Sequence, residues 1–236
     1  MLSPFKSAVH ALGTRYIRRL CSAEFRDQKK VRKNERSIEY RFVFECLTEL
    51  RPERVLDVGT GTTALPHLMR NCGYLVTAID NIVDYWPKGM VNRHFHVVND
   101  DITRSKIREK FDFITCISVL EHLPDHRAAV RSMLSLLNPG GHLVITCPYN
   151  ESEYVPNCYE LEGSGYGRGS AYVCQAYSRR ELDAWLEDTG AQLAKQEHWR
   201  LFTGKHWTQG EVLEFPKKVS ASEAHHLTCL LLRKSL

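Results

Sequence analysis

One short stretch, residues 55–61, carries the residues best suited to hold a small charged ligand. Its first four residues are apolar apart from Asp57, and they lead directly into Gly59, Thr60 and Gly61. Glycine lets a backbone turn sharply and approach a ligand without interference from a Cβ atom. A predicted helix over residues 63–72 would point its first N–H groups at the same gap, where an anion is favoured by about 0.3–1 kcal/mol.

Asp80 follows the next apolar run, at the spacing at which an acid accepts hydrogen bonds from ribose hydroxyls. Gly59, Gly61 and Ala64 also match the G-x-G-x-x-G/A fingerprint of dinucleotide-binding enzymes. A strand-to-helix turn that binds nothing could contain the same residues. The turn alone therefore leaves the ligand open.

Apolar strand segments alternate with amphipathic helical segments from residue 54 onward. The predicted strands cover residues 54–58, 74–79, 95–98, 111–117, 142–147, 192–202 and 225–232, and the predicted helices cover 63–72, 127–137 and 179–188. Such alternation is typical of a doubly wound α/β sheet whose ligands bind beyond the carboxyl ends of the strands. We expect a Rossmann-like, mostly parallel, seven-stranded sheet with an antiparallel last strand.

Two helices are expected before the sheet, one within residues 1–25 and one over 37–50. We group residues 1–50 as a helical cap and 51–236 as the main domain, in one structural unit. The first helix is basic and amphipathic, which suits a capping helix, a targeting segment or a membrane-surface helix. The charge run 26–36 between the helices is typical of a solvated loop or helix face.

Residues 149–176 are rich in Gly, Ser, Tyr and Glu, and they are too irregular for a regular element. A loop of this length in a compact domain is usually a lid or a recognition loop. We therefore expect this segment to cover a bound substrate. A second, charged and aromatic loop, which contains His206, Trp207 and Phe215, is predicted between the last two strands.

The composition excludes several classes of protein. The chain has 236 residues and a formal net charge of +4, so it has no global basic signal of the kind that dedicated nucleic-acid binders show. No apolar run approaches the roughly 18 residues that span a bilayer. The eight cysteines are scattered without a C-x-x-C pair, as in reduced intracellular proteins, although Cys158 and Cys174 could pair across the loop. We expect a soluble cytoplasmic monomer or homodimer.

The histidines do not have the spacing of a typical metal site. His94 and His96 alternate on a predicted strand, while His225 and His226 are adjacent. Neither pair presents two ligands on one face with a third close by in sequence. The sequence therefore predicts no bound metal.

Several motifs occur in a fixed order along the chain. They are Val55-Leu56-Asp57-Val58-Gly59-Thr60-Gly61, Asp80, Asp101-Ile102, Phe111-Asp112-Phe113-Ile114, Ser118-Val119-Leu120-Glu121-His122-Leu123 and Leu137-Asn138-Pro139-Gly140-Gly141. This series resembles the class I S-adenosylmethionine-dependent methyltransferases, in particular the subgroup of quinone-biosynthesis and natural-product enzymes. The resemblance is close over residues 50–148 and generic after 177. A dinucleotide dehydrogenase would need a second βαβ half and has no reason to carry the Leu-Asn-Pro-Gly-Gly turn.

The resemblance implies S-adenosyl-L-methionine as the cofactor. The cofactor-binding residues that it implies are Asp57, Gly59, Thr60, Gly61, Asp80, Asn81, Asp101, Ile102, Ile117 and Ser118. In the family the glycine turn wraps the methionine part, and Asp57 would direct its charge toward the amino group and the sulfonium. Ile117 and Ser118 would offer backbone carbonyls to the amino group.

The nucleoside part of the cofactor would lie against the next two strand ends. The resemblance implies that Asp80 accepts both ribose hydroxyls and that Asn81 or Ile82 lies along the adenosine. Asp101 would accept from the adenine amino group, and Ile102 would offer its backbone N–H. Asp100 could contact the adenine instead, because the sequence does not fix which of the two adjacent acids faces the ligand.

Methyl transfer is a direct displacement at an activated carbon, so alignment of the two reactants contributes most of the catalysis. A general base helps only when the acceptor starts protonated. His122, which follows the fourth strand, is the candidate base, although it could instead be a structural residue under the cofactor. Tyr149 is the second catalytic candidate, with His198 and His206 as further alternatives.

We therefore expect a methyltransferase that acts on an oxygen or nitrogen of a small molecule or sugar beneath the loop 149–176. One alternative is a methyltransferase of protein or RNA that uses the basic segment 26–36 as a docking strip. A second alternative is a non-catalytic, cofactor-binding subunit that supports a partner enzyme.

Overall fold

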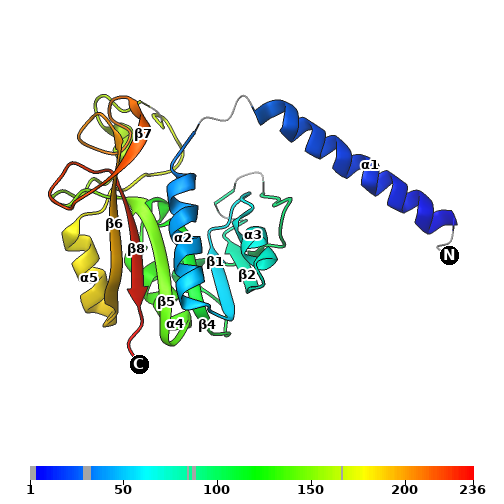
Figure 1. Cartoon of the computed structure of the whole chain (residues 1–236), viewed down its shortest axis with the longest axis horizontal. Helices are drawn as coiled ribbons and strands as arrows, with labels where there is room; N and C mark the ends of the chain where they lie inside the picture. The colour runs from blue at the N-terminus through cyan, green and yellow to red at the C-terminus, as the bar shows by residue number, and fades with distance from the viewer. Residues whose placement is uncertain (1–3, 29–32, 84, 87–88, 166) are drawn as a thin grey trace. The chain divides into compact units, whose positions relative to one another are not determined.

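A computed structural model describes residues 4–28, 33–83, 85–86, 89–165 and 167–236. The chain divides into two compact units, Met1–Arg36 and Ser37–Leu236. The first unit contains one helix, α1 (Pro4–Asp27), which confirms the predicted N-terminal helix (Figure 1). The apolar side chains of α1 are largely exposed, among them Phe5, Val9, Leu12, Tyr16 and Ile17. Residues 29–32 of the predicted charge run lie outside the described residues.

The second helix, α2 (Arg36–Leu50), falls almost entirely within the second unit. Phe42, Val43 and Cys46 on this helix are fully buried in a cluster that includes strand residues. Sequence reasoning grouped α2 with the first helix as a cap over residues 1–50. The structure instead divides at residue 36, because the apolar face of α2 is part of the core of the second unit.

The second unit is built on one mixed sheet. Its strands are β1 (Arg54–Val58), β2 (Leu75–Asp80), β3 (Val98–Asn99), β4 (Phe111–Ile117), β5 (Leu137–Pro148), β6 (Gln192–Phe202), β7 (Val212–Val219) and β8 (Leu227–Arg233). They are arranged in the order β3-β2-β1-β4-β5-β8-β6-β7. In this order the strands from β3 to β5 all pair in parallel, whereas β8 is antiparallel to both β5 and β6. This arrangement confirms the predicted Rossmann-like, mostly parallel sheet.

The sheet has eight strands where the sequence predicted seven. The additional strand, β7, lies in the segment that was predicted to be a loop, and it pairs antiparallel with β6. Phe215 is 71% exposed and Pro216 lies within the strand, so the alternation that marks a half-buried strand is missing. Proline is tolerated on an edge strand because its absent N–H would face solvent. The third strand is also shorter than predicted, at Val98–Asn99.

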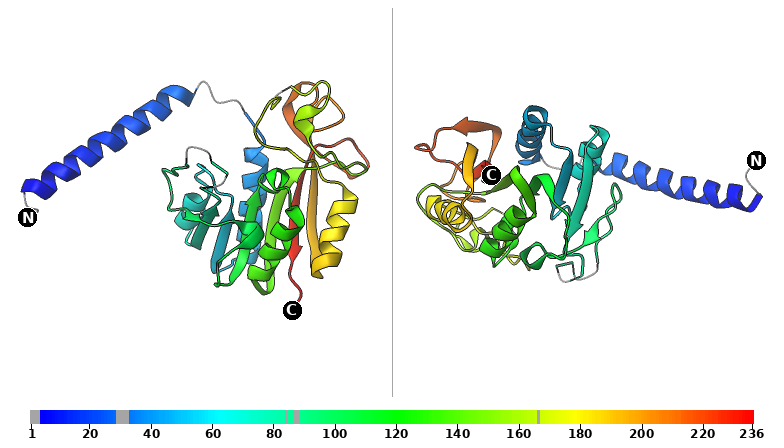
Figure 2. Two further views of the ribbon diagram at one scale, coloured as in Figure 1. Left: turned by 180° about the vertical axis from the view of Figure 1, so that it is seen from behind. Right: turned by 90° about the horizontal axis from the view of Figure 1, so that it is seen from below.

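Helices cover both faces of the sheet. α2 and α3 (Leu65–Asn71) pack with one hydrophobic cluster, and α4 (His126–Leu136) and α5 (Arg179–Thr189) pack with the other (Figure 2). Helix α5 is capped at both ends: Ser178 forms a capping box with Glu181, and Gly190 ends the helix in the left-handed region.

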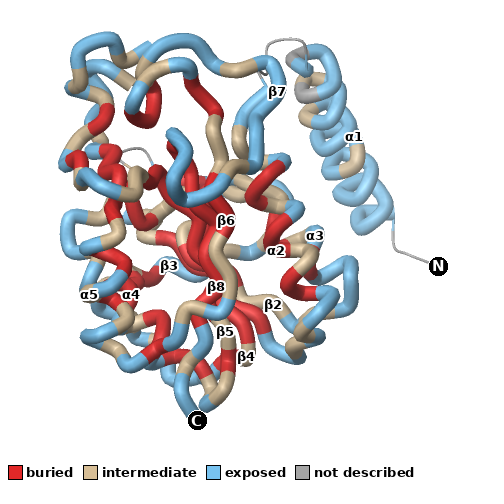
Figure 3. The backbone as a smooth tube through the Cα atoms, turned by 60° about the vertical axis from the view of Figure 1, so that its left-hand side comes forward, coloured by how far each residue is buried: buried red, intermediate tan, exposed pale blue. Residues whose placement is uncertain are grey.

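The central strands β4, β5 and β8 are buried along most of their length (Figure 3). All eight cysteines are free, and the alternative pairing of Cys158 with Cys174 is not formed. Burial raises the pKa of the Cys46 thiol to about 12, as expected for a packing residue. No helix in the described part of the chain combines the length and the apolarity that crossing a bilayer requires.

Candidate active site

The glycine turn after β1 is a preformed concave segment of backbone. Gly59 and Gly61 both have positive φ angles, 71° and 55°. A Cβ atom on Gly59 would lie only 2.4 Å from the side chain of Val119, so no larger residue fits there. The N–H of Gly59 donates to the carbonyl of Ile79 at 2.9 Å, which ties the turn to β2.

Asp57 holds this turn from within the sheet. Its carboxylate is buried and accepts hydrogen bonds from the hydroxyls of Thr60 (2.7 Å) and Thr115 (2.6 Å). Thr115 lies on β4, so Asp57 connects the turn to the neighbouring strand. Sequence reasoning did not identify Thr115, because only the parallel pairing of β1 with β4 brings it beside Asp57.

Asp80, at the end of β2, lies directly against the glycine turn. Its Oδ2 accepts the backbone N–H of Gly61 at 2.7 Å, and its Oδ1 accepts the indole N–H of Trp86 at 2.9 Å. Burial raises the pKa of this carboxyl group, and these hydrogen bonds act in the opposite direction. A ligand hydroxyl that reaches Asp80 would therefore compete with Trp86, a residue that sequence reasoning missed.

The segment after β3 adjoins the same edge. The N–H of Asp100 donates to the carbonyl of Asp80 at 3.0 Å, and its own carboxylate accepts the N–H of Lys106 at 3.1 Å. Asp101 caps a short 3₁₀ helix, η2 (Ile102–Arg104), through the N–H of Thr103. Asp101 is the more exposed of the two acids, so its side chain is the more accessible to a ligand.

Asn81 and Ile102 lie on either side of this edge. The carbonyl of Asn81 accepts the N–H of Tyr85 at 3.2 Å, which orders the start of the loop after β2. The side chain of Asn99 accepts the N–H of Ile82 at 2.8 Å and holds the same loop against β3. Ile102 is buried. The residues predicted for the nucleoside part thus come together at one end of the sheet.

Ile117 and Ser118 form the turn after β4. Ser118 has a positive φ of 50°, which is uncommon for a residue other than glycine. Its hydroxyl donates to Glu39 at 2.6 Å, and the hydroxyl of Thr146 donates to the same carboxylate oxygen at 2.7 Å. Glu39 is fully buried and belongs to α2. An acid on the apolar face of a helix was the signal that could have identified it.

His122 lies in an aromatic cluster, which we define as Tyr85, Trp86, His122 and Tyr172. The rings of Tyr85 and Tyr172 stack with centroids 4.7 Å apart. The His122 ring lies 6.4 Å from Tyr85 and 6.2 Å from Tyr172. Its Nδ1 is 2.7 Å from the carbonyl of Val173, so Nδ1–H donates there and Nε2 carries the lone pair.

Tyr149, the other predicted catalytic residue, belongs to a different cluster. Its hydroxyl donates to Glu151 at 3.0 Å, and its ring stacks on His225 with centroids 5.6 Å apart. Only 1% of Tyr149 is exposed, and burial raises its pKa. The structure therefore does not bring Tyr149 and His122 into one constellation.

The predicted recognition loop is ordered by backbone hydrogen bonds within itself and to the segment that follows β6. The N–H of Cys158 donates to the carbonyl of Cys174 at 2.7 Å, and the N–H of Gly165 donates to the carbonyl of Thr208 at 2.7 Å. Tyr172 from this loop supplies one wall of the aromatic cluster. Tyr166, another tyrosine of the loop, lies outside the described residues.

The chain is similar in sequence to known methyltransferases. A family model described as a methyltransferase domain matches residues 25–196. A ubiquinone biosynthesis O-methyltransferase of Xanthomonas euvesicatoria is 31% identical over 159 residues, which are 61% of this chain and 65% of that protein. A protein of the same name from Coxiella burnetii is 29% identical over 157 residues, again 65% of its length. The matched stretch thus spans slightly less than two thirds of these relatives.

Solved structures share the fold at low sequence identity. The 1,6-didemethyltoxoflavin-N1-methyltransferase of Burkholderia thailandensis superposes with a TM-score of 0.58 at 16% identity, over 100% of this chain and 92% of that one. An N-methyltransferase of Bradyrhizobium japonicum, solved with S-adenosyl-L-homocysteine, has a TM-score of 0.52 at 18% identity, over 85% and 87%.

Proposed function

Because this chain belongs to the methyltransferase domain family, we propose that it transfers a methyl group from S-adenosyl-L-methionine to an oxygen or nitrogen of a small molecule or sugar. The observation that carries this proposal is the 2.7 Å hydrogen bond between the glycine turn and the buried Asp80, next to the aromatic cluster. The positive φ angles of Gly59 and Gly61 give this turn its sharp curvature, and the lack of a Cβ on Gly59 lets it pack against Val119.

The residues at this edge fit the cofactor. The glycine turn would wrap the methionine part, and the carbonyls of Ile117 and Ser118 would accept from its amino group. Asp80 would accept the ribose hydroxyls in place of the Trp86 indole. When bound, the cofactor supplies a methyl carbon that the adjacent sulfonium makes electrophilic.

Asp101 and Ile102 would complete the nucleoside site. Asp101 is the more exposed acid after β3, so its carboxylate is available to the adenine amino group, and the N–H of Ile102 would meet the ring. Asn81 would lie along the adenosine, where its backbone already orders the loop. Asp57 and Thr60 keep the glycine turn in place during binding.

The aromatic cluster would bind the acceptor. Tyr85 and Tyr172 stack on each other at 4.7 Å, and a planar acceptor could extend this stack by packing against an outer face of one of the two rings. His122 has its Nδ1 committed to the Val173 carbonyl, so Nε2 would take the proton from an acceptor hydroxyl or amine. Tyr149 already donates its hydroxyl to Glu151, so it would act by supporting this region of the sheet.

We also propose a cellular compartment and an oligomeric state for this protein. The buried free thiols suit a reducing compartment such as the cytoplasm. We propose a monomer or homodimer, which size-exclusion chromatography with light scattering would distinguish.

Transfer of a radiolabelled methyl group from S-adenosyl-L-methionine tests the proposed function. The protein is incubated separately with metabolite extract, RNA and protein extract, and the label is measured in the soluble and precipitable fractions. We expect label in small molecules. Label confined to RNA or protein would contradict the acceptor class, and cofactor binding without transfer to any pool would contradict catalysis.

Asp80→Ala is the matched control for this assay. Removal of a hydrogen bond to a charged group costs about 1.5–3 kcal/mol, so S-adenosyl-L-homocysteine should bind roughly 10–100-fold more weakly to this variant in calorimetry. Transfer at low cofactor concentration should fall by a similar factor. An unchanged affinity would contradict the assignment of Asp80 to the ribose.

A further inference from the structure

Two buried imidazoles and a carboxylate meet beyond the end of β5. Glu151 follows β5, His198 lies on β6, and His225 precedes β8. One ligand atom of each residue lies within 4.8 Å of the other two. His198 Nε2 is 3.7 Å from Glu151 Oε2, and the two imidazole rings have centroids 4.6 Å apart.

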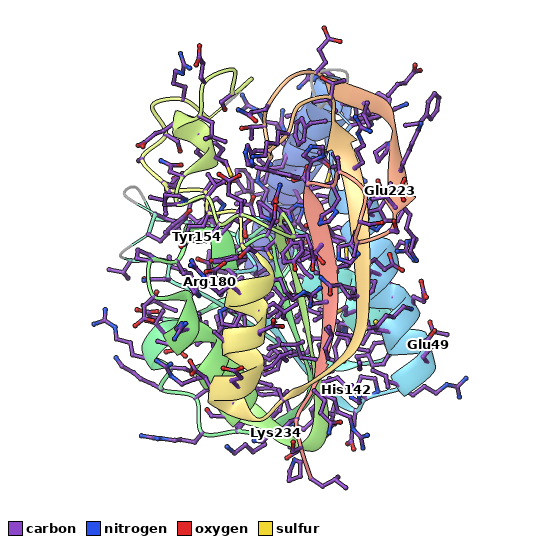
Figure 4. All side chains as sticks on the ribbon, turned by 90° about the vertical axis from the view of Figure 1, so that its left-hand side faces the viewer. Glu49, His142, Tyr154, Arg180, Glu223 and Lys234 are labelled. Atoms are coloured by element: carbon purple, nitrogen blue, oxygen red, sulfur yellow. The ribbon has the colours of Figure 1, made fainter. Side chains whose placement is uncertain are left out.

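The register of the sheet explains this meeting. Leu227, the first residue of β8, pairs with Pro148 on one side and with Trp199 on the other. The residues next to these three positions are therefore brought to one end of the sheet. Glu223, close to His225 in sequence, is seen toward the end of the sheet opposite His142 and Lys234 (Figure 4).

Both imidazoles present a nitrogen that has no hydrogen-bond partner. Nε2 of His198 and Nε2 of His225 are buried and unpartnered among the described residues. Only 8% of His198 and 3% of His225 is exposed. Buried polar atoms are nearly always paired, and an unpaired one costs about 1–3 kcal/mol. Two such atoms side by side indicate a missing partner common to both.

The unpartnered nitrogen of His225 carries a lone pair. Its Nδ1 lies 2.7 Å from the carbonyl of Glu223, so Nδ1–H donates to that oxygen and Nε2 is left as an acceptor. A histidine that ligates a metal commonly donates its other N–H to a backbone carbonyl in this way.

The carboxylate is oriented by two neighbours. Arg179 donates to Oε1 of Glu151 at 2.8 Å, and the Tyr149 hydroxyl donates to Oε2 at 3.0 Å. A second Arg179 nitrogen, Nη2, donates to Oε2 at 3.4 Å, and this oxygen faces His198 Nε2 at 3.7 Å. The Glu151 side chain is 33% exposed, which gives an ion a route from solvent and leaves space for a water ligand.

We propose that Glu151, His198 and His225 bind one divalent transition-metal ion, and that Zn²⁺ fits this donor set. Two imidazole nitrogens and one carboxylate oxygen, with a water in the fourth position, form a common tetrahedral zinc site. Mg²⁺ and Ca²⁺ prefer sites made of oxygen alone. Ligand atoms about 2.0–2.2 Å from one ion lie roughly 3.3–3.6 Å apart, so the cluster needs only a small contraction to close around it.

The site contacts Tyr149, which belongs to a different cluster from His122, and the proposal does not depend on methyl transfer. Sequence spacing did not predict it, because the three ligands come from three segments far apart in the chain. A bound ion would join the end of β5 to β6 and β8. It would thus stabilise the sheet beneath the recognition loop.

The full-length protein is stripped with chelator, and ZnSO₄ binding is then measured by calorimetry and by metal analysis after gel filtration. We expect one Zn²⁺ per chain. His198→Gln and His225→Gln should each lower the affinity at least about tenfold, with Glu151→Gln having an effect in the same direction. His206→Ala is the matched control, since His206 is also a buried histidine with an unpartnered nitrogen but lies outside the cluster.

Thermal unfolding gives a second readout that does not require activity. Zn²⁺ should raise the Tm of the wild-type chain and of His206→Ala, and should not raise the Tm of the cluster variants. Absence of a bound ion in the wild type, or binding unchanged in both histidine variants, would overturn the proposal. Co²⁺ spectra with intense thiolate absorption would also overturn it, because they would place the ion on cysteines.

Discussion

Asp80 is the residue on which the proposed cofactor site depends most. Its carboxylate is 7% exposed, and both of its oxygens accept hydrogen bonds from protein donors, Gly61 and Trp86. A buried carboxylate in this position is ready to receive hydroxyl donors without further desolvation. The Trp86 indole keeps it satisfied until a ligand arrives.

The raised pKa of Asp80 predicts a pH dependence of cofactor binding. Burial raises the folded-state pKa of Asp80 above the ordinary value of 3.8. The carboxyl group therefore binds a proton more readily in the folded protein than in the unfolded chain. The carboxylate is the form that accepts hydroxyls. Affinity for S-adenosyl-L-homocysteine should therefore be full above this pKa and fall as the pH is lowered through it, measured by calorimetry at constant ionic strength.

Asp80→Asn is the control for this dependence. Asparagine keeps the shape and one acceptor oxygen but does not titrate. The Asp80→Asn variant should therefore bind S-adenosyl-L-homocysteine more weakly, and its affinity should stay constant over the same pH range. The linked stability effect has the opposite sign. The raised pKa favours folding at low pH, and that contribution disappears as the pH rises through the pKa. A wild-type affinity that is flat in acid would contradict the role of Asp80.

At the scale of elements, α2 is joined to the turn after β4 by a single buried acid. Glu39 accepts hydrogen bonds from Ser118 and Thr146, which lie on two neighbouring strands or their ends. This contact explains how Ser118 is held at a positive φ. It also means that α2 supports the floor of the proposed site and does not only cover it.

Removal of the Glu39 carboxylate should destabilise both the whole fold and the turn after β4. Glu39→Ala leaves the buried Thr146 hydroxyl and the half-buried Ser118 hydroxyl without their acceptor, so the free energy of unfolding should fall by about 2–4 kcal/mol. Urea unfolding measures the change. Glu39→Gln retains an acceptor oxygen and should lose less than half as much. An alanine variant as stable as the wild type would show that Ser118 and Thr146 find other partners.

At the scale of the whole molecule, the second unit has a core of its own. Its two hydrophobic clusters lie on opposite faces of the sheet and contain no residue of α1. The described apolar side chains of α1 are mostly exposed, including Phe5 at 78% and Leu12 at 68%. The core of the second unit is therefore built from its own residues.

Deletion of residues 1–34 should consequently leave the unfolding of the second unit nearly unchanged. We expect the free energy of unfolding in urea of the shortened chain to match that of the full chain within about 0.5 kcal/mol, because no cluster residue is removed. Affinity for S-adenosyl-L-homocysteine should also be retained. A large loss of stability would show that α1 contributes to the folded core.

Much of the fold could be predicted from the sequence because its signals are local. The alternation of apolar strands and amphipathic helices predicted the sheet, and the glycines of the turn predicted where a backbone concavity would form. Asp80 could be placed against Gly61 because parallel neighbouring strands end at the same edge. β7 was missed, because an exposed edge strand has no buried face to impose a pattern.

The contacts that only the tertiary structure revealed join residues remote in sequence. Trp86 reaches Asp80 through the path of a loop, and Glu39 reaches Ser118 across 79 positions. The meeting of Glu151, His198 and His225 depends on how β8 inserts between β5 and β6. Periodicity reports which face of an element is buried, but not which residues of distant elements lie opposite one another. That depends on strand order and register, which arise only when the whole chain packs.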